Sequence, residues 1–181
     1  FEFASKKLKV DKEVVLAAVK MYGTALEFAS GNLKSDKEVV LAAVKASGDA
    51  LQFASDTLKN DKVVVLSAVK NEGQSLQYAS EQLKADREVV LAAVKQDDQA
   101  LEHASDELKK DKEFILEAYN KNLEVFNYVA DSMKKEIYKD KKAMKSVIEA
   151  QCEESSFPEI CIGSKNALNF IGFYKLKALF Y

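Results

Sequence analysis

Hydrophobic and polar positions follow one another along this chain in a pattern that returns every 25 residues. A mostly apolar run, VVLAAV in its commonest form, stands between an acidic–basic pair and a lysine in four successive copies. These copies are VDKEVVLAAVK at 10–20, SDKEVVLAAVK at 35–45, NDKVVVLSAVK at 60–70 and ADREVVLAAVK at 85–95. The triplet FAS, YAS or HAS recurs at the same interval, at 3–5, 28–30, 53–55, 78–80 and 103–105. Such self-similarity predicts a repeat array.

The apolar run is predicted to be a helix. An aspartate that can cap free backbone N–H groups precedes every copy, and these residues are Asp11, Asp36, Asp61, Asp86 and Asp111. Glutamate in the first turn and lysine near the end suit the helix dipole, and the alanines disfavour a strand. Gly23, Gly48 and Gly73 follow, where a left-handed residue is expected to end the helix. Valine at Gly48 is therefore expected to destabilise more than valine at Asn32.

The rest of each copy predicts a second, amphipathic helix of about three turns. In DALQFASDTLK at 49–59, Leu51, Ala54 and Leu58 lie on one helical face. Few residues remain for turns, so consecutive helices are expected to run antiparallel. Such a hairpin is too small to bury its own apolar faces, and stacking against neighbours buries them. The predicted fold is all-α: a right-handed or similar α-solenoid of antiparallel helical hairpins.

The pattern also divides the chain. Residues 1–127 are expected to hold five regular units, starting near 3, 28, 53, 78 and 103, and residues 128–150 a degenerate sixth. The sixth fits only with an insertion at 136–139, one helical turn long, which predicts an extended helix. A loop at 151–163 contains Cys152, Pro158 and Cys161, and an amphipathic C-terminal helix, a cap for the array, is predicted over 164–181.

The full pattern, DKEVVLAAVK followed by a glycine and then ALEFAS, resembles the repeats of DUF4116, a tandem-repeat family of unknown function. The resemblance covers roughly residues 1–127. It implies a repeat fold, and the family carries no activity that could be transferred to this chain.

Charge and hydropathy exclude several classes of protein. The chain has 27 Lys and Arg against 29 Asp and Glu, a net charge of −2, and Arg87 is its only arginine. Nucleic-acid readers usually show a basic excess and use arginine forks, so no nucleic-acid binding is expected. No apolar run approaches the roughly 20 residues of a membrane-spanning helix. The sequence opens inside a repeated element, which predicts a processed chain or a fragment of a longer array.

No constellation typical of catalysis, cofactor binding or metal binding is present. His103, the only histidine, occupies a position that holds Phe or Tyr in the other copies, which indicates packing. A lysine and, two residues later, an aspartate recur in every copy, which indicates a solvated face of mixed charge. These lysines are Lys9, Lys34, Lys59, Lys84 and Lys109.

The C-terminal region offers two further candidate sites. Cys152 and Cys161 could form a disulfide in an oxidising compartment or remain two thiols in a reducing one. Aromatic residues of the last segment could cap the end of the array, which is the favoured interpretation, or contact a protein partner or an anionic membrane surface. These residues are Phe170, Phe173, Tyr174, Phe180 and Tyr181.

Together these observations predict a protein that is not an enzyme. We expect a structural scaffold or protein-interaction module, such as a subunit of a larger assembly, with an unidentified protein partner and no cofactor. The alternative is a helper array of a longer enzyme or effector whose active domain lies outside this chain.

Overall fold

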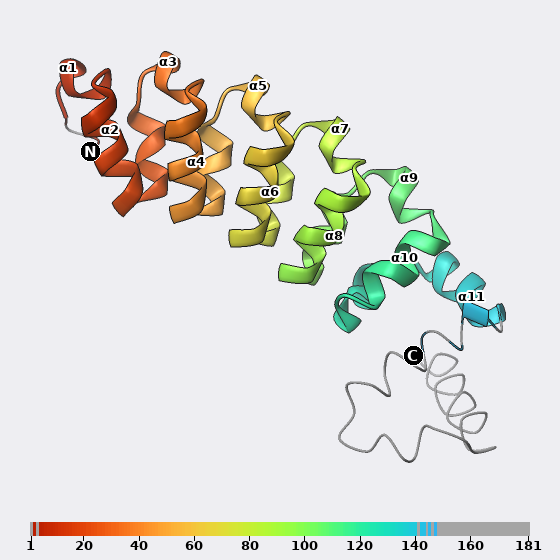
Figure 1. The fold of residues 1–181 in the computed structure, drawn as a ribbon. Helices are drawn as coiled ribbons and strands as arrows, with labels where there is room; N and C mark the ends of the chain where they lie inside the picture. Colours follow the sequence, from red (N-terminus) through yellow and green to blue (C-terminus); the bar gives the residue numbers. More distant parts are fainter. Residues whose placement is uncertain (1, 3, 141, 144, 146, 148–181) are drawn as a thin grey trace. The chain divides into compact units, whose positions relative to one another are not determined.

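The structure is a computed structural model that describes residues 2, 4–140, 142, 143, 145 and 147. The chain divides into two compact parts, Phe1–Ala130 and Asp131–Tyr181. Within the described residues every regular element is a helix and there is no strand, as the sequence predicts. Figure 1 shows the helices of the N-terminal part following one another as a regular series.

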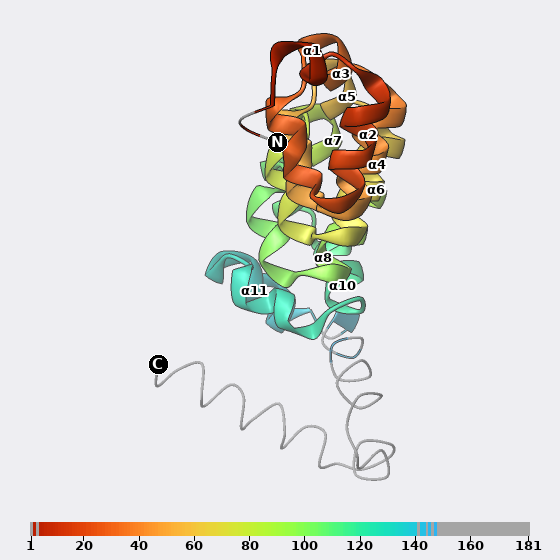
Figure 2. The same ribbon diagram turned by 90° about the vertical axis from the view of Figure 1, so that its left-hand side faces the viewer.

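Five long α-helices form one layer of the N-terminal part. Each packs against the next one along the chain, and viewed from the first repeat α2, α4 and α6 lie behind one another (Figure 2). They are α2 (Lys12–Met21), α4 (Lys37–Ala46), α6 (Lys62–Asn71), α8 (Arg87–Gln96) and α10 (Lys112–Tyr119). Their first residues are 25 apart. The apolar runs of the sequence are therefore helices, as predicted.

Aspartate caps start these helices, which confirms the capping prediction. The Asp36 carboxylate accepts hydrogen bonds from the backbone N–H groups of Glu38 at 2.9 Å and Val39 at 3.3 Å. The side chains of Asp11, Asp61, Asp86 and Asp111 accept N–H groups in the first turn of their own helices in the same way. An unpaired N–H group at a helix start is costly, so each aspartate stabilises its helix locally.

The second helix of each copy differs from its prediction. A 3₁₀-helix comes directly after each long helix: η1 (Gly23–Phe28), η2 (Gly48–Phe53), η3 (Gly73–Tyr78), η4 (Asp98–His103) and η5 (Leu123–Tyr128). An extended alanine or valine then ends it. A separate one-turn α-helix precedes each long helix. These short helices are α1 (Lys6–Lys9), α3 (Gly31–Lys34), α5 (Asp56–Lys59), α7 (Glu81–Lys84) and α9 (Asp106–Lys109).

Each repeat is thus a three-part unit, a short α-helix, a long α-helix and a 3₁₀-helix, rather than a two-helix hairpin. We number the repeats one to five from α1–α2–η1 to α9–α10–η5. The break within the predicted second helix is explained by hydrogen bonds to the preceding repeat. The N–H of Ser55, just after extended Ala54, donates to the carbonyl of Lys34 at 3.0 Å. Ser30, Ser80 and Ser105 donate to Lys9, Lys59 and Lys84 at 2.9–3.0 Å.

The glycines also have a different role from the predicted one. Gly23, Gly48 and Gly73 start the 3₁₀-helices, and none of them has the positive φ of a left-handed helix exit. They are glycine because the next repeat leaves no room for a side chain. A Cβ on Gly48 would lie 2.7 Å from the carbonyl oxygen of Ala68 and 2.5 Å from Oγ of Ser75. The constraint is a close approach between repeats.

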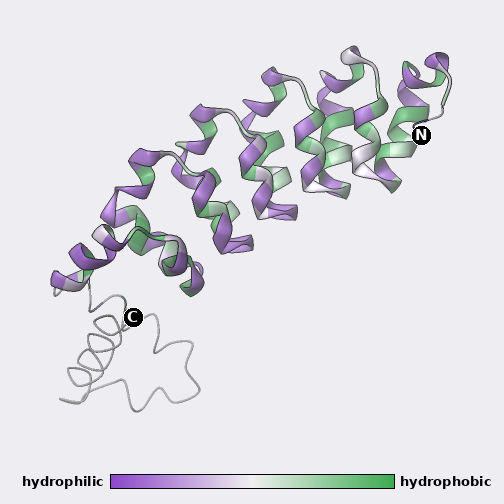
Figure 3. Ribbon diagram, turned by 180° about the vertical axis from the view of Figure 1, so that it is seen from behind, coloured by the Kyte–Doolittle hydropathy of each residue, from purple (hydrophilic) through white to green (hydrophobic). Residues whose placement is uncertain are grey.

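The hydrophobic core lies between the layer of long helices and the layer of 3₁₀-helices. Val39, Val40, Ala43 and Val44 of α4 are fully buried, and α6 and α8 bury the equivalent residues. Leu51 and its equivalents Leu26, Leu76 and Leu101 fill the 3₁₀ side. Figure 3 shows hydrophobic positions on the facing sides of the helices and hydrophilic positions on the short helices. Burial of each of these valine and leucine side chains stabilises the fold by about 1.5–3 kcal/mol.

The C-terminal part contains α11 (Asp131–Lys139), nine residues where the short helices of the repeats have four. The extra length includes the inserted residues 136–139, as the sequence predicts. Met133, Ile137, Ala143 and Val147 are buried.

Candidate interaction surface

Ion pairs join the outer faces of α2, α4 and α6 to the next repeat. Lys12 Nζ lies 2.8 Å from a carboxylate oxygen of both Asp36 and Glu38. Lys37 Nζ lies 2.6 Å from Asp61, and Lys62 Nζ contacts Asp86 and Glu88 at 2.8 and 2.9 Å. The aspartates therefore have two functions, a helix cap within their own repeat and an ion pair with the preceding one. This second function was missed from the sequence because nothing local specifies the partner.

The ion pairs lower the pKa values of the aspartate carboxylates. Hydrogen bonds from Lys12 and Lys37 lower the pKa of Asp36 and of Asp61, respectively. Burial opposes the shift at Asp86, but the Lys62 hydrogen bond and the N–H of Val89 outweigh it, so the pKa of Asp86 is also lowered. In each case the charged carboxylate is the form that the native array stabilises.

The third repeat interrupts this series of ion pairs. Val63 occupies the position of Glu38 and Glu88 and is 59% exposed. Lys37 consequently pairs with Asp61 alone, whereas Lys12 and Lys62 each contact two carboxylates. The middle of the array therefore presents an apolar spot between two charged junctions.

The only arginine lies at the junction of the fourth and fifth repeats. Arg87 donates to Asp111 at 2.6 Å and to Glu117 at 3.2 Å, and its guanidinium lies 5.2 Å from the ring centre of Phe114. The fifth helix has Phe114 and Glu117 where α8 has valine and alanine. A planar guanidinium can bind two carboxylates and stack on an aromatic ring at once, which an ammonium cannot.

A half-buried, mostly apolar strip runs one helical turn beyond the ion pairs. It consists of Leu16, Leu41, Leu66 and Leu91 together with Ala42, Ser67 and Ala92. Lys12 contacts Glu38, so the positions four residues later, Leu16 and Ala42, lie next to each other on neighbouring helices. One further turn along are Lys20, Lys45, Lys70 and Lys95, which are exposed and have no ion-pair partner among the described residues.

On the 3₁₀ side, an aromatic residue recurs at the end of each 3₁₀-helix, and lysines lie near Phe28 and His103. Phe28, Phe53, Tyr78, His103 and Tyr128 are each half-buried. The Lys9 ammonium lies 5.6 Å from the ring centre of Phe28. His103 Nε2 lies 3.0 Å from Oε1 of Gln74, and burial, aided by nearby Lys84 and Lys109, lowers its pKa. Lys84 and Lys109 pair with acids one turn earlier in their own short helices, at 2.8 and 3.1 Å.

The model of one protein family, the domain of unknown function DUF4116, matches three consecutive stretches of the chain, residues 1–34, 36–84 and 86–134. The chain belongs to this family. The match extends over all five repeats and confirms the resemblance seen in the sequence. No curated protein and no solved structure matches the chain.

Several predicted sites of this DUF4116 chain lie outside the described residues. They are the Cys152–Cys161 pair with Pro158, and the aromatic residues Phe170, Phe173, Tyr174, Phe180 and Tyr181. The C-terminal cap and its alternatives, contact with a partner or a membrane surface, therefore stay predictions.

The described residues of the DUF4116 chain contain neither a metal-binding cluster nor a membrane-spanning helix. No group of three or more His, Cys, Asp or Glu side chains there could hold a metal ion. None of the described helices is long and apolar enough to cross a membrane.

Proposed function

We propose that residues 1–130 form an α-solenoid with a 25-residue period that acts as a non-catalytic scaffold for protein interaction. The observation that carries this proposal is the apolar strip with its row of unpaired lysines. Both features recur on successive long helices, so one surface presents the same pair of groups several times at a fixed interval. Repetition of that kind suits an extended partner, because each repeat adds a similar increment of binding.

The chemistry of the surface indicates the partner. Half-buried leucines at 16, 41, 66 and 91 favour apolar side chains, and the lysines one turn away favour carboxylates. The ion-paired aspartates and glutamates on the other side of the strip would repel the closely spaced phosphates of a nucleic acid. We infer that the partner is a protein segment that carries both apolar and acidic side chains.

Photo-crosslinking tests this proposal. A crosslinking residue placed at Ser67 in the strip should capture a partner that the same residue at Asn32, exposed on a short helix, does not capture. The captured protein, once purified, should bind more weakly to the Lys45→Glu/Lys70→Glu variant and at higher salt. Equal capture at both positions, or unchanged affinity of the double variant, would contradict the proposed surface. Competition by a polynucleotide would indicate a nucleic-acid partner instead.

We also propose that the chain has no catalytic activity of its own. Its charged groups recur from repeat to repeat in structural pairs, whereas a catalytic group normally occurs once. Reproducible turnover of any substrate by the purified chain would overturn this. The helper-array alternative predicts turnover only when a further domain is attached, so assays of the natural full-length protein and of this chain together separate the two.

A further inference from the structure

The apolar strip on the long helices alternates large and small side chains. Leu16 and Ala42 lie next to each other on neighbouring helices, and Leu41 follows Ala42 on its own helix. Ser67 and Ala92 lie between leucines in the same way in the third and fourth repeats. This alternation favours a partner whose own apolar side chains interdigitate with the leucines.

The strip ends in the fifth repeat. Glu117 occupies the equivalent small position there, and its carboxylate lies 3.2 Å from the guanidinium of Arg87. Covering this ion pair with an apolar side chain would remove its contacts with water. The strip therefore offers three small positions between leucines, 42, 67 and 92, each one repeat from the next.

The two sides of the strip differ in charge. One turn after it lie Lys45, Lys70 and Lys95, which are exposed and have no ion-pair partner among the described residues. One turn before it lie Glu38 and Glu88, whose carboxylates already bind lysines at 2.8 and 2.9 Å. Only the lysine side therefore attracts further carboxylates.

The spacing of the repeats matches one conformation of a bound segment. Packed helices lie about 8–10 Å apart, and seven residues of an α-helix rise about 10.5 Å and return to the same side. A β-strand alternates its side chains, so residues about 10 Å apart point in opposite directions. Three residues of a polyproline helix also fit, at about 9.3 Å, but its backbone makes no internal hydrogen bonds. The strip offers that backbone a single hydroxyl, Ser67, whereas an α-helix satisfies its own.

We propose that the partner segment is an amphipathic α-helix that lies across α4, α6 and α8. Apolar residues seven apart pack on positions 42, 67 and 92, and acidic residues on one flank face Lys45, Lys70 and Lys95. This assignment rests on the proposed function, because the strip must first be the surface that binds a protein.

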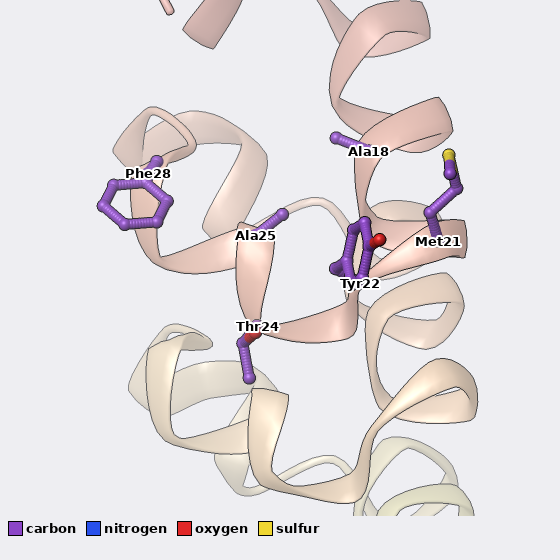
Figure 4. A pocket seen from close by; sticks show the side chains of 6 residues that line it. All are labelled: Ala18, Met21, Tyr22, Thr24, Ala25 and Phe28. Atoms are coloured by element: carbon purple, nitrogen blue, oxygen red, sulfur yellow. The ribbon is translucent and has the colours of Figure 1, made fainter. Parts of the chain in front are cut away.

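A pocket of about 380 Å³ in the first repeat offers no alternative place for this helix. Its lining side chains, shown in Figure 4, are Ala18, Met21, Tyr22, Thr24, Ala25 and Phe28. None of them is charged, and all belong to one repeat. The pocket therefore lacks the recurring pair of apolar and cationic groups that the strip presents.

Three labelled synthetic peptides test the proposal by their binding to the whole chain, measured by fluorescence anisotropy. The heptad peptide has three heptads with one leucine each and glutamates along one flank. The shifted peptide has the same composition, but its middle leucine is moved by two positions to the opposite side of the helix. The third, a polyproline peptide, has leucine at every third position. The heptad peptide should bind at least about tenfold more tightly than the other two.

A matched pair of variants locates the binding. Ala92→Gln introduces the neutral counterpart of Glu117, which the fifth repeat accommodates, and should weaken the heptad peptide at least about tenfold. Ala85→Gln, at the exposed end of α7, is the control and should leave the affinity unchanged. Both variants should keep the unfolding midpoint of the original chain, which shows that neither acts through the fold.

Equal binding of the heptad and shifted peptides, tighter binding of the polyproline peptide, or no binding of any peptide would overturn the helical partner. An equal effect of the two variants would overturn its position on the strip. Capture of a protein from Ser67 remains the separate test of the proposed function. Capture without a preference for the heptad peptide would overturn the helix and leave the interaction surface in place.

Discussion

Gly48 lies where the second and third repeats pack closely against each other. The residue is buried, and the space that a side chain would need is occupied by Ala68, Glu72 and Ser75. Gly31, by contrast, is exposed at the start of α3 with nothing within 4 Å of a potential Cβ. Packing therefore requires glycine at position 48, whereas it leaves room for a side chain at position 31 of the same repeat.

Alanine at Gly48 should destabilise the chain by about 1–3 kcal/mol, because the added methyl group would force two repeats apart. Alanine at Gly31 should be neutral or stabilising by up to about 1 kcal/mol, because it favours the helix and has room. Denaturant unfolding of both variants measures the difference. Equal unfolding free energies would show that the close approach at Gly48 does not constrain the fold.

The buried hydroxyl group of Ser75 leads to a second prediction. It is fully buried, and its hydroxyl oxygen has no hydrogen-bond partner. Ala25, Ala50 and Ala100 occupy the same position in other repeats. Ser75→Ala should therefore stabilise the chain by about 1 kcal/mol, because it removes an unsatisfied polar group from the core. Ser47→Ala, at a half-buried serine, is the control and should change stability by less than about 0.5 kcal/mol. A loss of stability in Ser75→Ala would indicate a bond to the hydroxyl.

At the scale of elements, consecutive long helices are coupled by the carboxylates that cap them. Each of Asp36, Asp61 and Asp86 stabilises the start of its own helix and binds a lysine of the preceding one. Exposed ion pairs contribute little individually. These aspartates nevertheless couple two parts of the fold, because protonation of one carboxylate weakens both a helix cap and a contact between repeats.

Acid should therefore weaken the array in a defined direction. The pKa values of Asp36, Asp61 and Asp86 are lowered in the folded state, so their contribution is complete above the unfolded pKa, about 3.9. It is lost as the pH falls through the lower folded values. Urea unfolding should show constant stability down to about pH 5 and a decline below it.

Lys62→Met removes the ion-pair partner of Asp86 and should make the decline shallower. The same substitution at Lys70, which has no ion-pair partner among the described residues, is the control and should leave the slope unchanged. An equal decline in all three proteins would mean that other carboxylates dominate acid unfolding.

At the scale of the whole molecule, the N-terminal part is held together by contacts between neighbouring repeats. In such arrays stability is approximately the sum of repeat and interface contributions, so a repeat with one interface opens more easily than a repeat with two. Among the described residues the first repeat packs against the second repeat alone, and its α2 buries only Val15 and Val19, whereas α4 buries four residues.

Amide exchange should follow this difference. The amides of α2 should exchange faster than those at the equivalent positions of α4, α6 and α8. Equivalent positions have nearly the same sequence in these helices, so the comparison is internal. Mass spectrometry of overlapping peptides measures it, and uniform protection from α2 to α8 would show that the array opens as a single unit.

Much of this architecture could be predicted from the sequence because the forces that decide it are local. An aspartate before an alanine- and valine-rich run specifies a helix start through its own hydrogen bonds, and all five such helices are present. The repeated spacing likewise specified stacked helical units, since no single repeat can bury its apolar side chains. The insertion at 136–139, one helical turn long, also predicted that α11 is longer than the short helices of the repeats.

The features that the sequence did not determine all depend on contacts between repeats. Residues 49–59 have the periodicity of one helix, but the hydrogen bond from Ser55 to Lys34 breaks that helix into a 3₁₀-helix and a short α-helix. The glycine at 48 suggested a left-handed exit, whereas the backbone of the next repeat excludes a side chain there. The lysine partners of Asp36, Asp61 and Asp86 are each 24 residues away in the sequence. Local propensity determined where the helices are, and only the packing of one repeat on another decided how they end and which charges pair.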